Sequence, residues 1–317
     1  MIDNLSGLIH LSLGISTTQL DRIIQRSPFT YKIYTIKKRS GGYRTIAQPA
    51  KETKFIQNWL IENIFSTFPV HECASAYKNG ASILKNAELH KKGEFLSKYD
   101  FKDFFSSIKV KDLVLFFTHQ LAHRFSKLDI LRMAQISCVR HTELSGLCLS
   151  IGAPSSPILS NAIMYDFDAK IYEWCNKNNI SYSRYADDLT FSTNELGRSD
   201  EITSLVNAAI LENKIVKLQI NKKKTVHLSK KYQRRITGLI ITNSNIVSIG
   251  RSRKREISTL IHKFSLNMLS DDEKYRLQGL LGFSKNIEPL FIERMNVKYG
   301  KDLINQIFKI RKSTDTA

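Results

Sequence analysis

Two adjacent aspartates, Asp187 and Asp188, lie inside the segment SRYADDLTFST, which runs from Ser183 to Thr193. Apolar and polar residues alternate on both sides of the pair, and this pattern predicts two half-buried strands joined by a tight turn at Ala186-Asp187. Adjacent carboxylates repel each other, so a pair at the tip of a hairpin favours a bound cation. The alternative is an ordinary turn in which the aspartates accept hydrogen bonds from backbone amides.

A third acid favours the metal interpretation. Asp100 ends the predicted strand in EFLSKYD, and carboxylates from two adjacent strands can meet at one edge of a sheet. Mg²⁺ binds few carboxylates and completes its octahedron with water and phosphate oxygens. Two such ions about 4 Å apart would activate an attacking hydroxyl and stabilise a leaving pyrophosphate. We therefore expect two Mg²⁺ ions near Asp100, Asp187 and Asp188.

The charge balance indicates a polyanionic partner. The 317 residues include 48 Lys and Arg against 29 Asp and Glu, which gives a net charge of +19. Such a surface favours nucleic acid, because neutralising phosphates releases their counterions. A basic protein without such a partner is the alternative interpretation.

Apolar runs, the N-terminus and the cysteines indicate the cellular compartment of the protein. No apolar run approaches the ~20 residues that span a bilayer, and the N-terminus lacks the basic region of a signal peptide. We therefore expect a cytoplasmic protein with no membrane partner. The cysteines form no CxxC pair, which predicts four reduced, buried thiols: Cys73, Cys138, Cys148 and Cys175.

The remaining patterns predict mixed helices and strands. A hairpin begins at Tyr31, turns at Ser40-Gly41-Gly42 and ends at Pro49. From Arg251 onward the pattern is wholly helical, and Ser270-x-x-Glu273 is a capping box. Helical periodicity also occurs at 17–26, 51–65, 112–124, 128–139 and 201–213, with short strands between 233 and 249.

For two helices, the sequence predicts which residues cap the helix or form its apolar side. Ser156 would cap a helix with Pro157 at its first position, and one side of that helix would carry Leu159, Ile163, Phe167, Ile171 and Trp174. The first C-terminal helix would place one apolar stripe in the core: Ile257, Leu260, Ile261, Phe264 and Met268.

The segment Tyr185-Ala186-Asp187-Asp188 resembles the central motif of reverse transcriptases, and other segments follow in that family's order. DFKDFF, which begins at Asp100, resembles the first acidic motif. GAPSSP resembles the loop and helix that line the nascent base pair. INKKKT resembles the motif whose lysine, here Lys224, approaches the triphosphate, and RTI contains the matching fingers arginine, Arg44.

Two further segments resemble signatures of retron-type reverse transcriptases. Asn86-Ala87-x-x-His90 resembles the NAxxH signature, and Ile236-Thr237-Gly238 resembles the VTG segment with isoleucine for valine. The chain length also fits this class, and we expect fingers, palm and thumb without an RNase H or endonuclease domain. The chain departs from the family pattern at Ile151, where the family usually has glutamine. How this chain selects its nucleotide is therefore left open.

The resemblance implies an α+β fold, a right-hand polymerase with a palm built on a small antiparallel sheet flanked by helices. It places an N-terminal helix and fingers at 1–93, the catalytic palm with the remaining fingers helices at 94–250, and a helical thumb at 251–317.

The resemblance also implies a role for each matched residue. Asp100, Asp187 and Asp188 would form the metal site, with the Phe101 carbonyl as an extra ligand, and Lys224 would protonate the leaving pyrophosphate. Phe105 would exclude a 2′-hydroxyl, so that dNTPs are the substrates. The other expected nucleotide contacts are Arg44, Phe101, Gly152, Ala153 and Pro154. The expected nucleic-acid contacts are Asn86, His90, Thr237, Gly238, Arg251, Arg253, Lys254 and Arg255.

The implied activity is RNA-directed DNA synthesis by a nucleotidyltransferase. Its template would be a cognate structured noncoding RNA, primed from an RNA 2′-hydroxyl, and its product a branched RNA–DNA molecule (msDNA). An effector protein and a role in bacterial antiphage defence are also implied. The alternatives are a group II intron-like or diversity-generating reverse transcriptase, and a non-catalytic RNA-binding scaffold with a polymerase-like fold.

Overall fold

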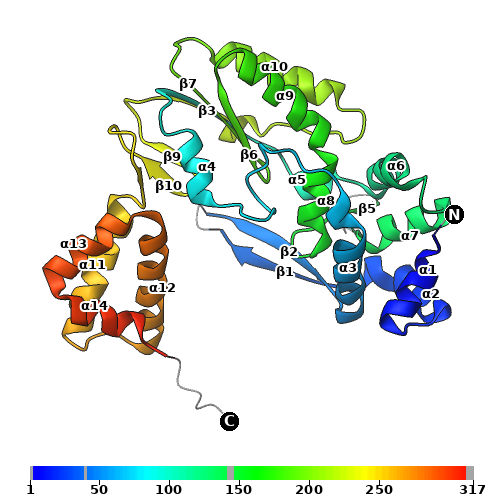
Figure 1. Cartoon of the computed structure of the whole chain (residues 1–317), viewed down its shortest axis with the longest axis horizontal. Coiled ribbons are helices and arrows are strands. Elements are labelled where there is room, and N and C mark those ends of the chain that lie inside the picture. The colour runs from blue at the N-terminus through cyan, green and yellow to red at the C-terminus, as the bar shows by residue number, and fades with distance from the viewer. Residues whose placement is uncertain (1–2, 39–40, 141–145, 312–317) are drawn as a thin grey trace. The chain divides into compact units, whose positions relative to one another are not determined.

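The computed structural model describes residues 3–38, 41–140 and 146–311. The chain forms two compact units. The first combines Met1–Ala81 with Leu96–His227, and the second combines Ser82–Phe95 with Leu228–Ala317. Both units mix helices with strands, which confirms the α+β class (Figure 1). The expected subdomain limits at 93 and 250 stay predictions.

A four-stranded sheet in the order β6-β7-β3-β8 carries the acidic residues. β6 (Ser181–Tyr185) pairs antiparallel with β7 (Asp188–Thr193), and Tyr185 lies opposite Asp188. The two-residue turn therefore falls at Ala186-Asp187, as predicted. The other two strands are β3 (Phe95–Asp100) and β8 (Val226–Ser229).

The expectation of half-buried strands at this hairpin is wrong. Ser183 is 1% exposed and Thr190 is 2% exposed, although both belong to the polar positions of the alternating pattern. The helices α9 (Tyr165–Lys177) and α10 (Ser199–Glu212) lie side by side in Figure 1, next to these strands. Small hydroxyl side chains fit such a covered face when they find hydrogen-bond partners.

The predicted N-terminal hairpin is present. β1 (Tyr31–Lys37) and β2 (Tyr43–Pro49) pair antiparallel over seven residues each. Most of their side chains are exposed. Ser40 of the expected turn lies outside the described residues, while Gly41 and Gly42 have φ of 90° and 75°, a region that glycine adopts without strain.

The helices predicted at 17–26, 51–65, 112–124, 128–139 and 201–213 are present to within a few residues at their ends, whereas α1 and α5 have no counterpart in the predictions. Two short strands, β4 and β5, pair in the same unit. The elements are α1 (Leu5–Leu13), α2 (Thr17–Arg26), α3 (Lys51–Asn63), α5 (Phe104–Ser107), α6 (Val110–Leu121), α7 (Lys127–Ile136), β4 (Val139–Arg140), β5 (Leu147–Cys148), α8 (Ser155–Ile163), α9 (Tyr165–Lys177) and α10 (Ser199–Glu212).

The predicted helix after GAPSSP is two helices, α8 and α9, which meet at Met164 with φ −88° and ψ 3°. The expected cap is also wrong, because α8 begins at Ser155 and follows Pro154. The Ser156 hydroxyl instead accepts a hydrogen bond from the Ser150 amide at 3.2 Å. The apolar side still packs as predicted, except that Trp174 is only partly buried.

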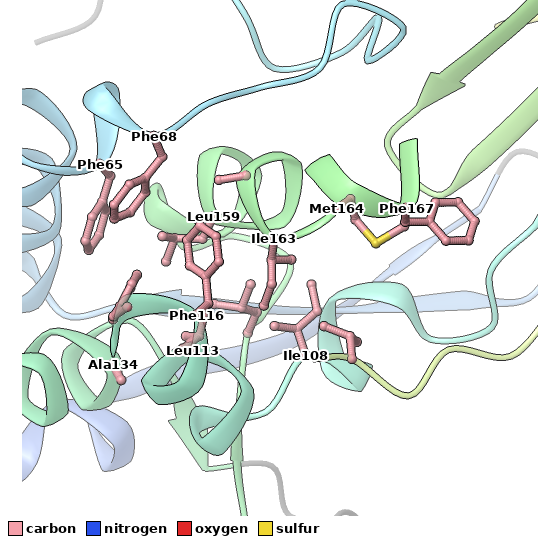
Figure 2. Packing of buried hydrophobic residues seen from close by; sticks show 14 of the residues in the cluster. Phe65, Phe68, Ile108, Leu113, Phe116, Ala134, Leu159, Ile163, Met164 and Phe167 are labelled. Atoms are coloured by element: carbon pink, nitrogen blue, oxygen red, sulfur yellow. The ribbon is translucent and has the colours of Figure 1, made fainter. Parts of the chain in front are cut away.

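One large apolar core fills the first unit. Figure 2 shows Phe65 and Phe68 of one short segment and Phe116 of α6 gathered beside Leu159 and Ile163 of α8. The Phe65 and Phe117 rings stack at 5.4 Å between centroids. This core fixes the base on which α8, α9 and the four-stranded sheet rest, because close-packed side chains resist displacement.

The second unit consists of a small sheet and five helices in the part of the chain that the structure describes. Its sheet has the order β11-β10-β9. The Ser270–Glu273 capping box is confirmed at the start of α12. The elements are α4 (Ile83–Leu89), β9 (Arg234–Ile236), β10 (Leu239–Ile241), β11 (Val247–Ser248), α11 (Arg251–Ser265), α12 (Asp271–Ile287), α13 (Pro289–Tyr299) and α14 (Lys301–Phe308).

The predicted apolar stripe of α11 holds only in part. Ile257 and Ile261 are fully buried, but α11 ends at Ser265, so Met268 lies beyond the helix and is 64% exposed. Leu269 is buried instead. The helical period no longer applies once the chain leaves the helix.

All four cysteines are free and buried, as predicted. Burial raises the pKa of the Cys175 thiol to about 12, so this thiol stays protonated. Among the described residues, no helix is both long and apolar enough to cross a bilayer.

Candidate active site

Backbone hydrogen bonds bring the three aspartates to one place. The Phe101 amide donates to the Asp187 carbonyl at 3.0 Å, which ties the end of β3 to the hairpin turn. On the other side, the Asn221 amide donates to the Asp100 carbonyl at 2.8 Å, so the chain before Lys224 is also attached to β3. The end of β3 is therefore held between the two segments that carry the other predicted catalytic residues.

Lys224 forms an ion pair with Asp100. Its Nζ donates to Oδ1 at 2.8 Å and to Oδ2 at 3.0 Å. The lysine side chain is 57% exposed whereas that of Asp100 is 10% exposed. Lys222 and Lys223 occupy the same short 3₁₀ turn with exposed side chains. The structure therefore distinguishes Lys224 from its two neighbours.

Burial and neighbouring carboxylates raise the pKa values of Asp187 and Asp188. Burial, then Asp188 and Asp100, raise the pKa of Asp187 to about 6. The pKa of Asp188 is also raised, first by burial, and the nearby Lys98 opposes that rise. Sequence reasoning missed Lys98, whose position two residues before Asp100 places it on the same strand. Partly desolvated acids that repel one another are a setting that a cation would stabilise.

The donor set fits a hard divalent cation. Carboxylate oxygens are the ligands such cations prefer. Burial and the neighbouring carboxylates keep the pKa values of Asp187 and Asp188 raised although Lys224 and Lys98 oppose the rise. In the described part of the chain, no group of three or more His, Cys, Asp or Glu side chains is arranged to hold a metal. The Lys224 ammonium instead lies against Asp100.

Phe101 is buried beside this site. It is 2% exposed and its ring contacts those of Phe104 and Phe167, each at 5.6 Å between centroids. This packing fixes the backbone next to Asp100. The metal-ligand role of the Phe101 carbonyl stays a prediction.

Tyr77 is a site residue that sequence reasoning missed. Its ring lies 6.3 Å from that of Phe105, and it is 45% exposed with φ 58°. Burial and then Asp187 raise the pKa of its hydroxyl, and Arg44 lowers it. Tyr77 therefore lies within electrostatic range of both Asp187 and Arg44. The sequence gives no periodic signal for an aromatic residue in a loop. The positive φ of Tyr77, visible only in the structure, is the feature that marks this residue.

The GAPSSP loop is attached to the strand that carries Arg44. The Ala47 amide of β2 donates to the Ile151 carbonyl at 2.8 Å. Gly152 has φ +119°, and a Cβ there would lie 2.9 Å from the Ala47 carbonyl oxygen. Only glycine allows this approach. Ala153 is buried and Pro154 precedes α8, so the predicted loop has a defined position against β2.

The two retron-signature segments come together in the second unit. Thr237 and Gly238 form the β9–β10 turn with φ 45° and 84°, and the Thr237 hydroxyl donates to the Ile83 carbonyl of α4 at 3.3 Å. Asn86 of α4 is 2% exposed, and His90, which directly follows this helix, is 0% exposed. This burial favours a role in positioning α4, and direct nucleic-acid contact by these residues stays a prediction.

The basic cluster of α11 does not form one uniform surface. Arg251 and Arg255 are exposed. Lys254 pairs with Glu288 at 2.6 Å, and the Arg253 guanidinium lies 4.9 Å from the centre of the Phe283 ring. Consecutive helical residues point in different directions, so two of the four nucleic-acid contacts predicted on α11 have partners within their own unit.

We predict that Asp187→Asn stabilises the metal-free protein above pH 6. The unfolded chain releases the Asp187 proton near pH 4, but the folded protein holds it until about 6, so wild-type stability falls between these values. Thermal unfolding in chelator-treated buffer should show the variant gaining up to about 3 kcal/mol at pH 7.5 and nothing below about pH 4. A gain that does not depend on pH would contradict this explanation.

We predict that Gly152→Ala destabilises the first unit by about 2 kcal/mol, through a strained φ and displacement of the loop from Ala47. Urea unfolding measures the change. Gly197→Ala is the matched control, because Gly197 has φ +85° but no atom within 4 Å of its added Cβ. An equal loss in both variants would mean that the close approach contributes nothing.

Comparison with known proteins gives one consistent family. The family model described as reverse transcriptase (RNA-dependent DNA polymerase) matches residues 36–241. The Retron Ec83 reverse transcriptase of Escherichia coli is 40% identical over 308 residues, covering 94% of this chain and 98% of that protein. The Retron Ec73 reverse transcriptase of Escherichia coli is 33% identical over 291 residues, covering 88% and 90%.

A third relative extends the same result. The Retron Ec86 reverse transcriptase of Escherichia coli is 31% identical over 301 residues, covering 92% of this chain and 89% of that protein. These matches and the α+β architecture agree with the right-hand polymerase fold expected from the motifs. The chain belongs to the retron-type reverse transcriptases and is an RNA-directed DNA polymerase.

Proposed function

We propose that this protein copies part of a cognate structured noncoding RNA into single-stranded DNA, starting from a 2′-hydroxyl of that RNA. The product is msDNA, a branched RNA–DNA molecule, and dNTPs are the substrates. The similarity to three retron reverse transcriptases supports the RNA and the product. The same similarity supports a place in an antiphage defence system with an effector protein.

The observation that carries the catalytic proposal is the meeting of Asp100, Asp187 and Asp188 with Lys224. Three acids from two strands are attached to one another through the backbone, and the pKa values of Asp187 and Asp188 are raised. Groups with perturbed pKa values cluster at functional sites. A scaffold without catalysis gives no reason to keep this unfavourable cluster of charge.

Asp100, Asp187 and Asp188 would hold two Mg²⁺ ions. When bound, the ions would activate the attacking hydroxyl and neutralise the charge that develops on the phosphates. Asp100 would first have to exchange its lysine partner, and the exposed, flexible Lys224 side chain can leave. Lys224 would then be free to donate a proton to the leaving pyrophosphate.

The remaining first-unit residues would select and hold the nucleotide. The planar guanidinium of Arg44 would donate several N–H hydrogen bonds to the triphosphate. The Gly152-Ala153-Pro154 loop attached to β2 would support the nascent base pair. Phe105, whose ring lies near that of Tyr77, would exclude a ribose 2′-hydroxyl. In the second unit, the exposed Arg251 and Arg255 would contact the backbone of the template–product duplex.

Two other functions remain as alternatives. A group II intron-like or diversity-generating enzyme would share the palm motifs, but retron relatives match nearly the full chain. A non-catalytic RNA-binding scaffold would bind RNA without making DNA. The nucleic acid that co-purifies with the protein distinguishes all three.

We predict that the protein purified from cells containing its RNA carries RNA covalently joined to DNA, and that it extends a DNA primer on an RNA template with dNTPs and Mg²⁺. Asp187→Asn should abolish both results. RNA without attached DNA, together with no extension by wild type, would support the scaffold alternative. Extension without any branched product would support another class of reverse transcriptase.

We predict that Lys224→Ala lowers the rate of nucleotide addition by about 10²-fold or more, because the general acid is lost. Lys222→Ala and Lys223→Ala are matched controls from the same turn and should stay within about twofold. The Mg²⁺ requirement of Lys224→Ala should not increase, since the lysine opposes metal at Asp100. Equal effects of all three substitutions would mean that the lysines act only as a basic surface.

A further inference from the structure

The hairpin that carries Asp187 contains a fully buried ion pair. Arg184 of β6 and Asp168 of α9 are both 0% exposed. The Arg184 Nε donates to both Asp168 oxygens at 2.9 and 3.0 Å, and Nη2 donates to Oδ2 at 2.6 Å. The Tyr182 hydroxyl adds a hydrogen bond to Oδ1 at 3.1 Å. One edge of the guanidinium, formed by Nε and Nη2, is thus fixed by one carboxylate.

The remaining guanidinium nitrogen, Nη1, bonds to the catalytic turn. Arg184 Nη1 donates to the Ala186 carbonyl at 3.1 Å and to the Asn161 Oδ1 at 3.2 Å. Ala186 has φ 57° and is 5% exposed. A residue with a Cβ avoids this region unless its surroundings hold it there. The carbonyl that Arg184 binds belongs to the peptide that leads directly into Asp187.

The same network extends to the segment before Tyr77. The side-chain amide of Asn161 donates to the Ala76 carbonyl at 2.8 Å. The backbone amide of Ser75 donates to the Arg184 carbonyl at 2.8 Å. A buried ion pair is by itself weak evidence for a stabilising role, since apolar replacements are often equally stable. The specific feature here is that the pair directs a charged donor at a strained backbone next to a catalytic residue.

We propose that Arg184, oriented by Asp168, is a positioning residue for the turn that presents Asp187 to the metal site. The inference rests on the proposed metal-dependent function. The Arg184 Nη1 fixes the Ala186 carbonyl from inside the unit, while the Phe101 amide fixes the Asp187 carbonyl from β3. The turn is held at two successive carbonyls, so the Asp187 side chain has a defined direction before any metal binds.

Arg184→Lys tests this role. An ammonium can still pair with Asp168 but lacks the planar fork that reaches the turn at the same time. The expected result is a Mg²⁺ requirement for primer extension that increases about tenfold or more, as for other residues that orient metal ligands. The Mg²⁺ titration of the melting temperature should shift to higher concentration by a similar factor, and the KM for dNTP should change less.

A second variant covers the case in which Arg184→Lys does not fold. Asp168→Leu/Arg184→Met replaces the pair with apolar side chains and leaves no buried charge unpaired. This double variant should keep a cooperative unfolding transition and show the same shift in both Mg²⁺ titrations. A wild-type Mg²⁺ response in whichever of these variants folds would overturn the inference.

Two controls separate positioning from stability. Tyr182→Phe removes one hydrogen bond to Asp168 without touching the turn. Arg234→Lys alters another fully buried arginine, which bonds to the Gly93 and Thr242 carbonyls in the second unit. Both should lower the melting temperature while its Mg²⁺ titration keeps the wild-type midpoint. If they shift that midpoint as far as Arg184→Lys does, the positioning role is wrong.

Wild type itself separates this inference from the proposed function. Wild type that neither melts higher with Mg²⁺ nor extends a primer on its cognate RNA would overturn the proposed function and this inference with it. Wild type that responds to Mg²⁺, alongside Arg184 variants that respond equally, would overturn the positioning role alone.

Discussion

Repulsion among three carboxylates is the constraint on which the catalytic part of this structure depends. Asp100, Asp187 and Asp188 come from two strands, and burial together with their mutual charge raises the pKa of Asp187 to about 6. Flexible segments would let the acids separate. The chain prevents this with backbone hydrogen bonds on both sides of the end of β3, one to the Asp187 carbonyl and one from the Asn221 amide.

The rest of the first unit can be understood as support for that arrangement. The two hairpin strands β6 and β7 are buried on both faces, and their polar residues are buried with them. The Arg184–Asp168 pair satisfies the buried charge there and also bonds to the turn. Lys224 partly neutralises Asp100. Stability and catalytic geometry thus rely on the same polar contacts, which is why substitutions need separate measurements of metal response and unfolding.

The second unit shows another use of motif residues. Asn86 and His90 are buried, and the Thr237–Gly238 turn bonds back to the start of α4. Residues that are distant in sequence therefore build one local structure, with Arg234 fully buried in the same unit. A signature segment need not touch substrate, since fixing a helix and a turn against each other is also a specific requirement.

The sequence by itself determined the YADD hairpin and its turn, α2, the capping box of α12 and the family, because these depend on local periodicity and short motifs. It failed where α8 and α9 separate at Met164 and where Ser156 was expected to cap, since the end of a helix depends on what the flanking loop bonds to. Only the tertiary structure decided the pairing of Lys224 with Asp100, the burial of His90 and the partner of Arg184. Those contacts join residues far apart in the chain, and no local pattern encodes which of several charged side chains will meet.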